Sequence, residues 1–308
     1  MRSVRFHEYG NSGVLRLEDV DRPSISPGQV LVRVAATATN VLDIALREGQ
    51  MLEVFPGPLP SGQGFDLAGT VTEIGSQVTA FAVGDEVIGW APRRAQAEFV
   101  AVGVDELAHK PNAVSWAAAA SIPTAGGTAY GAVHAVNPQP GETVVVSAAA
   151  GGVGALVTQL AIQAGATVVG TAGPANFEFL RSLGAIPVAH GDGLLERIEQ
   201  AVPNGVSAFL DNFGDGNVDL ALQLGVAPDR INTIIDFAAA QQHRVHTAGQ
   251  EAGNSGRVFA ELAHLVAENK LVIPIHATYP IEDVQRAYDE LAQRHSRGKI
   301  VLTLDPAS

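Results

Sequence analysis

The pattern of apolar and polar positions changes near residue 116, and the change divides the chain into two kinds of structure. Before this point, short apolar runs alternate with turn residues such as Gly84 and Asp85. The runs predict strands over 29–34, 66–74 and 86–89. One helix is predicted over 41–48, ended by Gly49. Many short strands at this spacing indicate a barrel-like β domain.

Beyond residue 116, strands and helices alternate. Helices are predicted over 117–120, 130–136, 153–164 and 176–183. Strands are predicted over 143–147, 167–170, 186–189, 207–210 and 231–235. This alternation is typical of βαβ units around a parallel sheet, and the wholly apolar run 144–146 is typical of a strand buried on both faces. After Lys270 the chain returns to a strand, a helix over 281–292 and a last strand over 299–302.

Composition narrows the classes of function. The 308 residues include 19 Lys and Arg against 32 Asp and Glu, a net charge of −13, and no cysteine. Disulfides and thiolate metal sites are therefore excluded, and the acidic balance argues against a nucleic-acid partner. No apolar leader follows Met1, and glycines interrupt the uncharged stretch 143–177, which argues against a membrane helix. We expect a soluble, cytoplasmic protein.

The segment 143–154 carries the clearest chemical signal. A predicted strand enters a glycine-rich turn with the spacing Ala149-x-Gly151-x-x-Gly154, and the turn opens a helix. Glycines let backbone N–H groups approach a pyrophosphate, and the helix N-terminus adds partial positive charge. The predicted contacts to a dinucleotide are Ala150, Gly151, Gly152, Val153 and Gly154. The alternative is a glycine turn that serves close packing alone.

The end of the next strand bears on the choice of nucleotide. An NAD site usually places a carboxylate there for the ribose 2′-OH, but residues 170–176 contain none, and no Lys or Arg either. Small neutral residues leave room for a 2′-phosphate, with Thr171, Gly173 and Asn176 as candidate contacts. NADPH is therefore preferred, and NADH is not excluded.

Several motifs in order resemble the medium-chain dehydrogenase/reductase superfamily, and within it the zinc-independent quinone oxidoreductase, or zeta-crystallin-like, branch. The motifs are Pro27-Gly28-Gln29-Val30-Leu31-Val32, Asn40-x-x-Asp43, Gly64-Phe65-Asp66-x-Ala68-Gly69-x-Val71, Val83-Gly84-Asp85-Glu86-Val87, the glycine-rich turn, Leu183-Gly184-Ala185 and Gly298-Lys299-Ile300-Val301-Leu302. The resemblance covers essentially the whole chain. It implies an α/β protein with a GroES-like β-barrel catalytic domain, residues 1–116 and 271–308. A Rossmann domain with a doubly wound parallel sheet, residues 117–270, would lie between these segments, and the resemblance suggests a homodimer.

The resemblance also implies that no metal takes part. Zinc-dependent relatives have a cysteine where Asn40 stands and a histidine in the segment occupied by residues 62–64, and neither is present. Without a Lewis acid, alcohol oxidation is poorly supported. Hydride transfer from NADPH to a quinone or an α,β-unsaturated carbonyl is easier. The alternatives are an enoyl reductase of secondary metabolism and a nucleotide-binding sensor or structural protein without turnover.

The resemblance assigns two catalytic residues. Asn40 stands at a position that faces substrate in relatives, and its amide would donate to a carbonyl oxygen; the alternative is a turn or helix-cap asparagine. Thr128 matches a position close to the nicotinamide, and its alternative is a helix N-cap. Asp43 is expected to form a hydrogen bond near the start of the helix.

The remaining assignments concern the cofactor and the substrate pocket. The predicted cofactor contacts carried over from relatives are Asn212, Phe213, Phe237, Arg294 and Lys299. The last two would lie near the phosphates, and a solvated surface charge is the alternative for Lys299. Quinone-reducing relatives often have tyrosines where this chain has Ala45 and Met51, so the pocket lacks two phenols. They also often have a lysine near Asn176. This chain lacks that cation at the 2′-phosphate site, and His190 would have to take its place.

Overall fold

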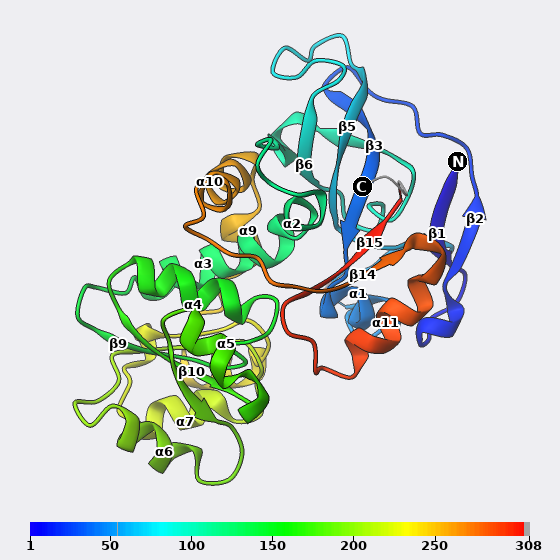
Figure 1. Ribbon diagram of the computed structural model, residues 1–308. Helices are drawn as coiled ribbons and strands as arrows, with labels where there is room; N and C mark the ends of the chain where they lie inside the picture. Colours follow the sequence, from blue (N-terminus) through cyan, green and yellow to red (C-terminus); the bar gives the residue numbers. More distant parts are fainter. Residues whose placement is uncertain (54, 305–308) are drawn as a thin grey trace. The chain divides into compact units, whose positions relative to one another are not determined.

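The computed structural model describes residues 1–53 and 55–304, which divide into two compact units. Unit 1 comprises Met1–Thr124 and Asn254–Ser308, and unit 2 comprises Ala125–Gly253. Both ends of the chain therefore contribute to unit 1, whose blue and red segments appear in Figure 1. The domain limits at 116 and 270 stay a prediction.

Unit 1 is built mainly of antiparallel strands. They are β1 (Arg2–Phe6), β2 (Arg16–Asp19), β3 (Gln29–Ala38), β4 (Ser61–Gly62), β5 (Asp66–Ile74), β6 (Glu86–Trp90), β7 (Phe99–Gly103), β8 (Leu107–His109), β14 (Ile275–Pro280) and β15 (Lys299–Thr303). The larger sheet has the order β14-β15-β3-β5-β6-β8, and β7 pairs with β3. The long strand β3 pairs with β5 along one edge and with β7 and then β15 along the other, which lets the sheet curl into a barrel.

Two apolar clusters hold unit 1 together. Inward-facing residues of the barrel strands, such as Val32, Leu67 and Val87, form the first. The second lies where α11 packs on β15 and β1, with Tyr288 and Phe6 among its members. The helices of this unit are α1 (Val41–Arg47), α2 (Trp116–Ala120), α10 (Gly256–Ala267) and α11 (Val284–Ala292).

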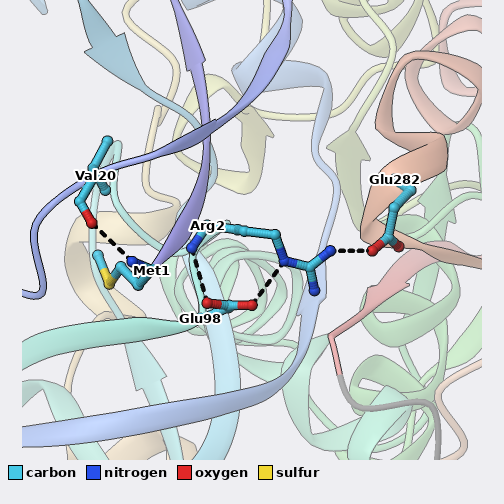
Figure 2. A network of polar contacts seen from close by, with 5 residues as sticks. All are labelled: Met1, Arg2, Val20, Glu98 and Glu282. Carbon is cyan, nitrogen blue, oxygen red and sulfur yellow. Dashed lines mark hydrogen bonds and ion pairs between the residues drawn. The ribbon is translucent and has the colours of Figure 1, made fainter.

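The start of the chain is fastened to later parts of unit 1. The amino group of Met1 donates to Val20 O at 2.8 Å, and Arg2 donates through its backbone N and its Nε to the carboxylate of Glu98, both at 2.8 Å. Figure 2 shows the same guanidinium reaching Glu282, so that Arg2 lies between two carboxylates. The first strand is therefore tied to both the barrel and the C-terminal segment.

Unit 2 is a five-stranded parallel sheet with helices on both faces. Its strands are β9 (Thr143–Val146), β10 (Thr167–Ala172), β11 (Ile186–Ala189), β12 (Ala208–Asp211) and β13 (Ile231–Thr233), in the order β11-β10-β9-β12-β13. Its helices are α3 (Gly127–Val136), α4 (Gly154–Gln163), α5 (Phe177–Ser182), α6 (Leu194–Ala201), α7 (Asn217–Gln223), α8 (Phe237–His243) and α9 (Gln250–Gly253). Figure 1 shows α4 on one side of the sheet and α6 and α7 on the other. β-branched residues such as Val145 and Val169 are fully buried between these layers.

The predicted fold class is confirmed. The expected strands 66–74 and 186–189 coincide with β5 and β11, and most other predicted elements differ by a few residues at their ends. The expected strand 231–235 is too long, because the chain leaves the sheet after Thr233. Helices α6, α7, α8, α9 and α10 were not predicted. None of the helices within the described residues has the length and apolar character that a membrane span requires.

Candidate active site

The glycine-rich turn of unit 2 joins β9 to α4 and needs glycine at its end. A Cβ on Gly154 would lie 2.2 Å from Ala148 O, so that no side chain fits between the helix and the turn. A Cβ on Gly151 would lie 3.3 Å from the same oxygen, a contact that a small shift relieves. Ala148 itself has a left-handed backbone with φ of 47°, which the sequence did not indicate.

This turn lies where the order of the sheet reverses. The chain passes from β9 to β10 on one side, and β12 pairs with the other side of β9. Ala149 N donates to Thr171 O at 3.0 Å and Ser147 N donates to Leu210 O at 3.0 Å, so the turn is held against both neighbours. Ligands of doubly wound sheets bind in this crevice, beyond the carboxyl ends of the strands.

Asp211 organises the carboxyl ends of three strands and was missed by the sequence reasoning. Its Oδ1 accepts from Ser147 Oγ at 2.8 Å and from Phe213 N at 3.0 Å, and its Oδ2 accepts from Thr233 Oγ1 at 2.8 Å. The side chain of Asn212 also forms a hydrogen bond within the protein, since its Nδ2 donates to Ser147 O at 3.0 Å. The backbone and amide donors of Asn212 and Phe213 therefore hold the strands, which leaves their carbonyls and the Phe213 ring for a ligand.

Apolar side chains are exposed at the same edge of the sheet. Phe213 follows β12, and Ile235 and Phe237 follow β13, with exposed fractions of 45%, 37% and 54%. Large apolar side chains exposed at the carboxyl ends of strands are suited to packing against a planar ring of a ligand. Two of the three, Phe213 and Phe237, were predicted to contact the cofactor.

The end of β10 is uncharged and closely packed. Thr171 is only 3% exposed, and a Cβ on Gly170 would lie 2.9 Å from the Ala149 Cβ, so β10 approaches the turn closely. A Cβ on Gly173 would lie 3.8 Å from His190 Nε2, which places this imidazole beside the strand end. The next carboxylate along the chain, Glu178, is paired with Arg181 at 2.7 Å.

Thr128 is buried in unit 2 as the second residue of α3. A π-helical turn, Ile122–Gly126, precedes the helix, and Gly126 is its N-cap. The alternative role of Thr128 as a helix N-cap is therefore wrong, and its position near the nicotinamide stays a prediction. Its methyl group lies 3.6 Å from the Cβ position of Gly249, so this side chain is part of the packing of unit 2.

Asn40 in unit 1 precedes α1 and joins two charged groups. Its backbone N donates to Asp43 Oδ2 at 2.7 Å, the helix-start bond expected of Asp43. Its side chain makes no cap bond: Nδ2 donates to Asp66 Oδ2 at 2.9 Å, and Oδ1 accepts from Lys299 Nζ at 2.5 Å. The amide carries two N–H groups, and Asp66 occupies one of them.

Lys299 is an interior residue, with 5% of its surface exposed, so the surface-charge alternative is wrong. Its ammonium donates to Thr39 O at 2.8 Å as well as to Asn40. Asp66 is fully buried, and its Oδ1 accepts from Thr124 N at 2.9 Å. Burial raises the pKa of Asp66 and lowers that of Lys299, and the two opposite charges act against both shifts. Arg294, the other predicted phosphate ligand, is exposed after α11 with a φ of 55°.

Asp43 is a second buried carboxyl in this cluster. Its Oδ2 also accepts from Tyr288 OH at 2.9 Å, and Gln96 Nε2 donates to that hydroxyl at 2.6 Å. Its Oδ1 has no hydrogen-bond partner among the described residues. Burial raises the pKa of Asp43 to about 7.

Replacing Asp43 with asparagine is expected to raise the melting temperature, and the gain should grow with pH. Because the folded-state pKa of about 7 lies above the unfolded value, the protonated carboxyl favours folding at low pH, and this contribution is lost as the pH rises through 7. Asparagine retains an acceptor for Asn40 N and Tyr288 OH and cannot ionise. The gain should be a few degrees larger at about pH 8 than at about pH 5, as measured by thermal unfolding of both proteins. A gain that does not vary with pH would contradict this assignment.

Within residues 1–53 and 55–304, no group of three or more His, Cys, Asp or Glu side chains is arranged to hold a metal ion. His243 and His246, which are spaced like a ligand pair, contact Asp219 and the carbonyl of Asp229 separately.

Comparison with known proteins identifies the family. The sequence-family model for the alcohol dehydrogenase GroES-like domain matches residues 26–112. The family model for zinc-binding dehydrogenase matches residues 183–302. The structure of the quinone oxidoreductase from Coxiella burnetii is similar with a TM-score of 0.88 and 31% identity, covering 99% of each chain. This chain belongs to the medium-chain dehydrogenase/reductase superfamily, in its quinone oxidoreductase branch.

Two curated relatives from this superfamily have more specific names. The 2-methylene-furan-3-one reductase of Solanum lycopersicum is 37% identical over 197 residues, which are 60% of this chain and 50% of that protein. The chain therefore spans half the length of this relative. The chloroplastic NADPH-dependent alkenal/one oxidoreductase of Arabidopsis thaliana is 29% identical over 326 residues, covering 98% of this chain and 79% of that protein.

Membership of this superfamily gives the cluster around Asn40 a context. At the position where the resemblance implies a cysteine in zinc-dependent relatives, this chain has an amide that lies between an ammonium and a carboxylate. The side-chain amide of Asn40 thus has both its donor and its acceptor partner within the chain.

Proposed function

We propose that this protein is a metal-independent reductase that uses NADPH to reduce the carbon–carbon double bond of α,β-unsaturated carbonyl compounds, with quinones as further substrates. The observation that carries the proposal is the glycine-rich turn at the switch point of the parallel sheet, between β9 and α4. Such a turn presents backbone N–H groups and a helix N-terminus to an anion. The crowding at Gly154 fits this use, because the helix must start close to the strand.

Different residues of unit 2 would contact different parts of the dinucleotide. The turn 150–154 would receive the pyrophosphate, and the exposed rings of Phe213 and Phe237 would pack against planar groups of the cofactor. Beside the ribose, the uncharged segment 170–176 and the adjacent His190 would accommodate a 2′-phosphate. When bound, NADPH supplies the hydride.

Asn40 is the residue we assign to the substrate. As hydride arrives at the carbon β to a carbonyl, negative charge develops on the carbonyl oxygen. An N–H donor fixed at that oxygen lowers the barrier without a metal, and the second hydrogen of Asn40 Nδ2 can act in this way. A conjugated double bond is already polarised, so no group is needed to ionise an alcohol.

The pocket residues favour enones over quinones. Ala45 and Met51 stand where quinone-reducing relatives often carry tyrosines. The names of the tomato and Arabidopsis relatives also refer to unsaturated ketones and aldehydes. An enoyl reductase of secondary metabolism would use the same residues in the same roles.

NADPH is expected to raise the melting temperature more than NADH does at equal concentration. A ligand stabilises the folded protein in proportion to the logarithm of its concentration relative to its Kd. Because no carboxylate follows β10 within residues 170–176, the 2′-phosphate meets no repulsion there and the 2′-OH loses its usual acceptor. Thermal unfolding with each nucleotide measures the two shifts, and a larger shift with NADH would overturn the assignment.

A panel of enones, enals and quinones tests the proposed function. The absorbance of reduced nicotinamide should fall when purified protein, NADPH and an enone are mixed, and the product should be the saturated ketone. Binding of NADPH without turnover on any member of the panel would instead favour a sensor or structural protein.

A further inference from the structure

The side-chain amide of Asn40 has one orientation that its neighbours allow. Lys299 is a donor only, and it faces Oδ1 at 2.5 Å. Asp66 is an acceptor in its ionised form, and its Oδ2 faces Nδ2 at 2.9 Å. Rotating the amide by half a turn would bring the NH2 group against the ammonium and the carbonyl against the carboxylate. Both contacts would be repulsive, so the two charges fix which way the amide points.

We propose that Lys299 is a positioning residue of the reductase, acting through Asn40, whose second N–H it aims and strengthens as the donor to the substrate oxygen. This inference rests on the proposed function, because it assigns Lys299 a part in that same reaction. Because its ammonium donates to Thr39 O and Asn40 Oδ1, we assign Lys299 a role through Asn40 in place of the phosphate contact expected from the sequence.

Burial makes this chain of hydrogen bonds effective. Lys299, Asn40 and Asp66 are 5%, 8% and 0% exposed, so little water screens the ammonium from the amide. A cation at the carbonyl end of an amide withdraws electrons from the nitrogen, which makes its hydrogens better donors. The bond from Lys299 Nζ to Thr39 O, at 2.8 Å, fixes the ammonium itself next to Asn40.

Lys110 provides a matched control within unit 1. It is also buried, at 8% exposed, and its Nζ donates to Glu86 Oε2 at 2.7 Å. Its ammonium packs over the Trp116 ring at 4.5 Å instead of contacting Asn40. Substitution of Lys110 therefore removes a buried ammonium without touching the amide.

A double-mutant cycle on kcat tests the inference. We expect Lys299→Met to lower kcat for an enone by about tenfold or more, with Kd for NADPH unchanged. In the Asn40→Ala background the same substitution should have almost no effect, because Lys299 acts only through that amide. Lys110→Met should leave kcat unchanged apart from any loss of folded protein. Effects of Lys299→Met and Asn40→Ala that multiply, or an unchanged kcat in Lys299→Met, would overturn the proposal.

Two further measurements keep the test decisive. If Lys299→Met does not fold, Lys299→Arg takes its place in the cycle, because it keeps the charge while moving the donors, and the same non-additivity is expected. The nuclear magnetic resonance signal of the Asn40 side-chain NH2 should shift upfield in the Lys299 variant and stay in place in Lys110→Met. If the wild-type protein reduces no substrate, the proposed function fails, whereas this signal still decides whether Lys299 governs the amide.

Discussion

Replacing Asn40 with alanine is expected to lower kcat for enone reduction by about 100-fold while leaving Kd for NADPH unchanged. Loss of one donor to a developing oxyanion typically reduces kcat by about 100- to 1,000-fold. The start of α1 should survive, because the bond to Asp43 comes from the backbone N of residue 40, which alanine retains. Steady-state kinetics and nucleotide titration measure the two quantities.

A second asparagine serves as the control for this substitution. Asn11 caps a short helical turn in unit 1, where its side chain accepts from Gly13 N at 3.0 Å. Asn11→Ala removes an asparagine side chain from unit 1 without touching the buried cluster, so kcat should be unchanged. A kcat for Asn40→Ala equal to that of Asn11→Ala would show that Asn40 does not meet the substrate oxygen.

Replacing Gly151 with valine is expected to weaken NADPH binding by at least about tenfold, since each lost charge-assisted contact costs about 1.5–3 kcal/mol. The added side chain would occupy the approach of the pyrophosphate to the backbone. The fold should tolerate it, because the Cβ meets only Ala148 O, at 3.3 Å. Calorimetric titration with NADPH measures the change.

Gly154→Ala separates loss of binding from loss of folding. Its Cβ would lie 2.2 Å from Ala148 O, so this variant should lose stability even without nucleotide. Gly151→Val should instead melt close to the wild type when no nucleotide is present. An unchanged Kd in Gly151→Val would remove the turn from the cofactor site.

The fold was predictable wherever local sequence determines structure. The strand β5 and the helix α4 have apolar runs and glycine boundaries that can be recognised from a short window. Helix α6 was missed because half of its residues, LLERIEQA, are polar and only Ile198 is buried. Its position depends on packing against β11, which a local window does not contain.

The candidate site was predictable in its residues but not in their connections. Asn40 was singled out from a motif, yet its partners Asp66 and Lys299 lie 26 and 259 positions away. Only the folded barrel brings these three together. The alternative capping role of Thr128 is wrong for a related reason, since the π-helical turn before α3 moves the helix start to Gly127. A lone acidic residue at the end of the buried strand β12 was the signal that could have identified Asp211.

In the proposed reaction, hydride passes from NADPH to the β carbon of an enone without a metal. A direct measurement uses NADPH with deuterium at both hydrogen positions of nicotinamide C4, an enone substrate and protein dialysed against a strong chelator. We expect a saturated ketone with deuterium on the carbon β to the carbonyl and a solvent proton on the α carbon. A product without deuterium, or turnover that returns only when zinc is added, would contradict it.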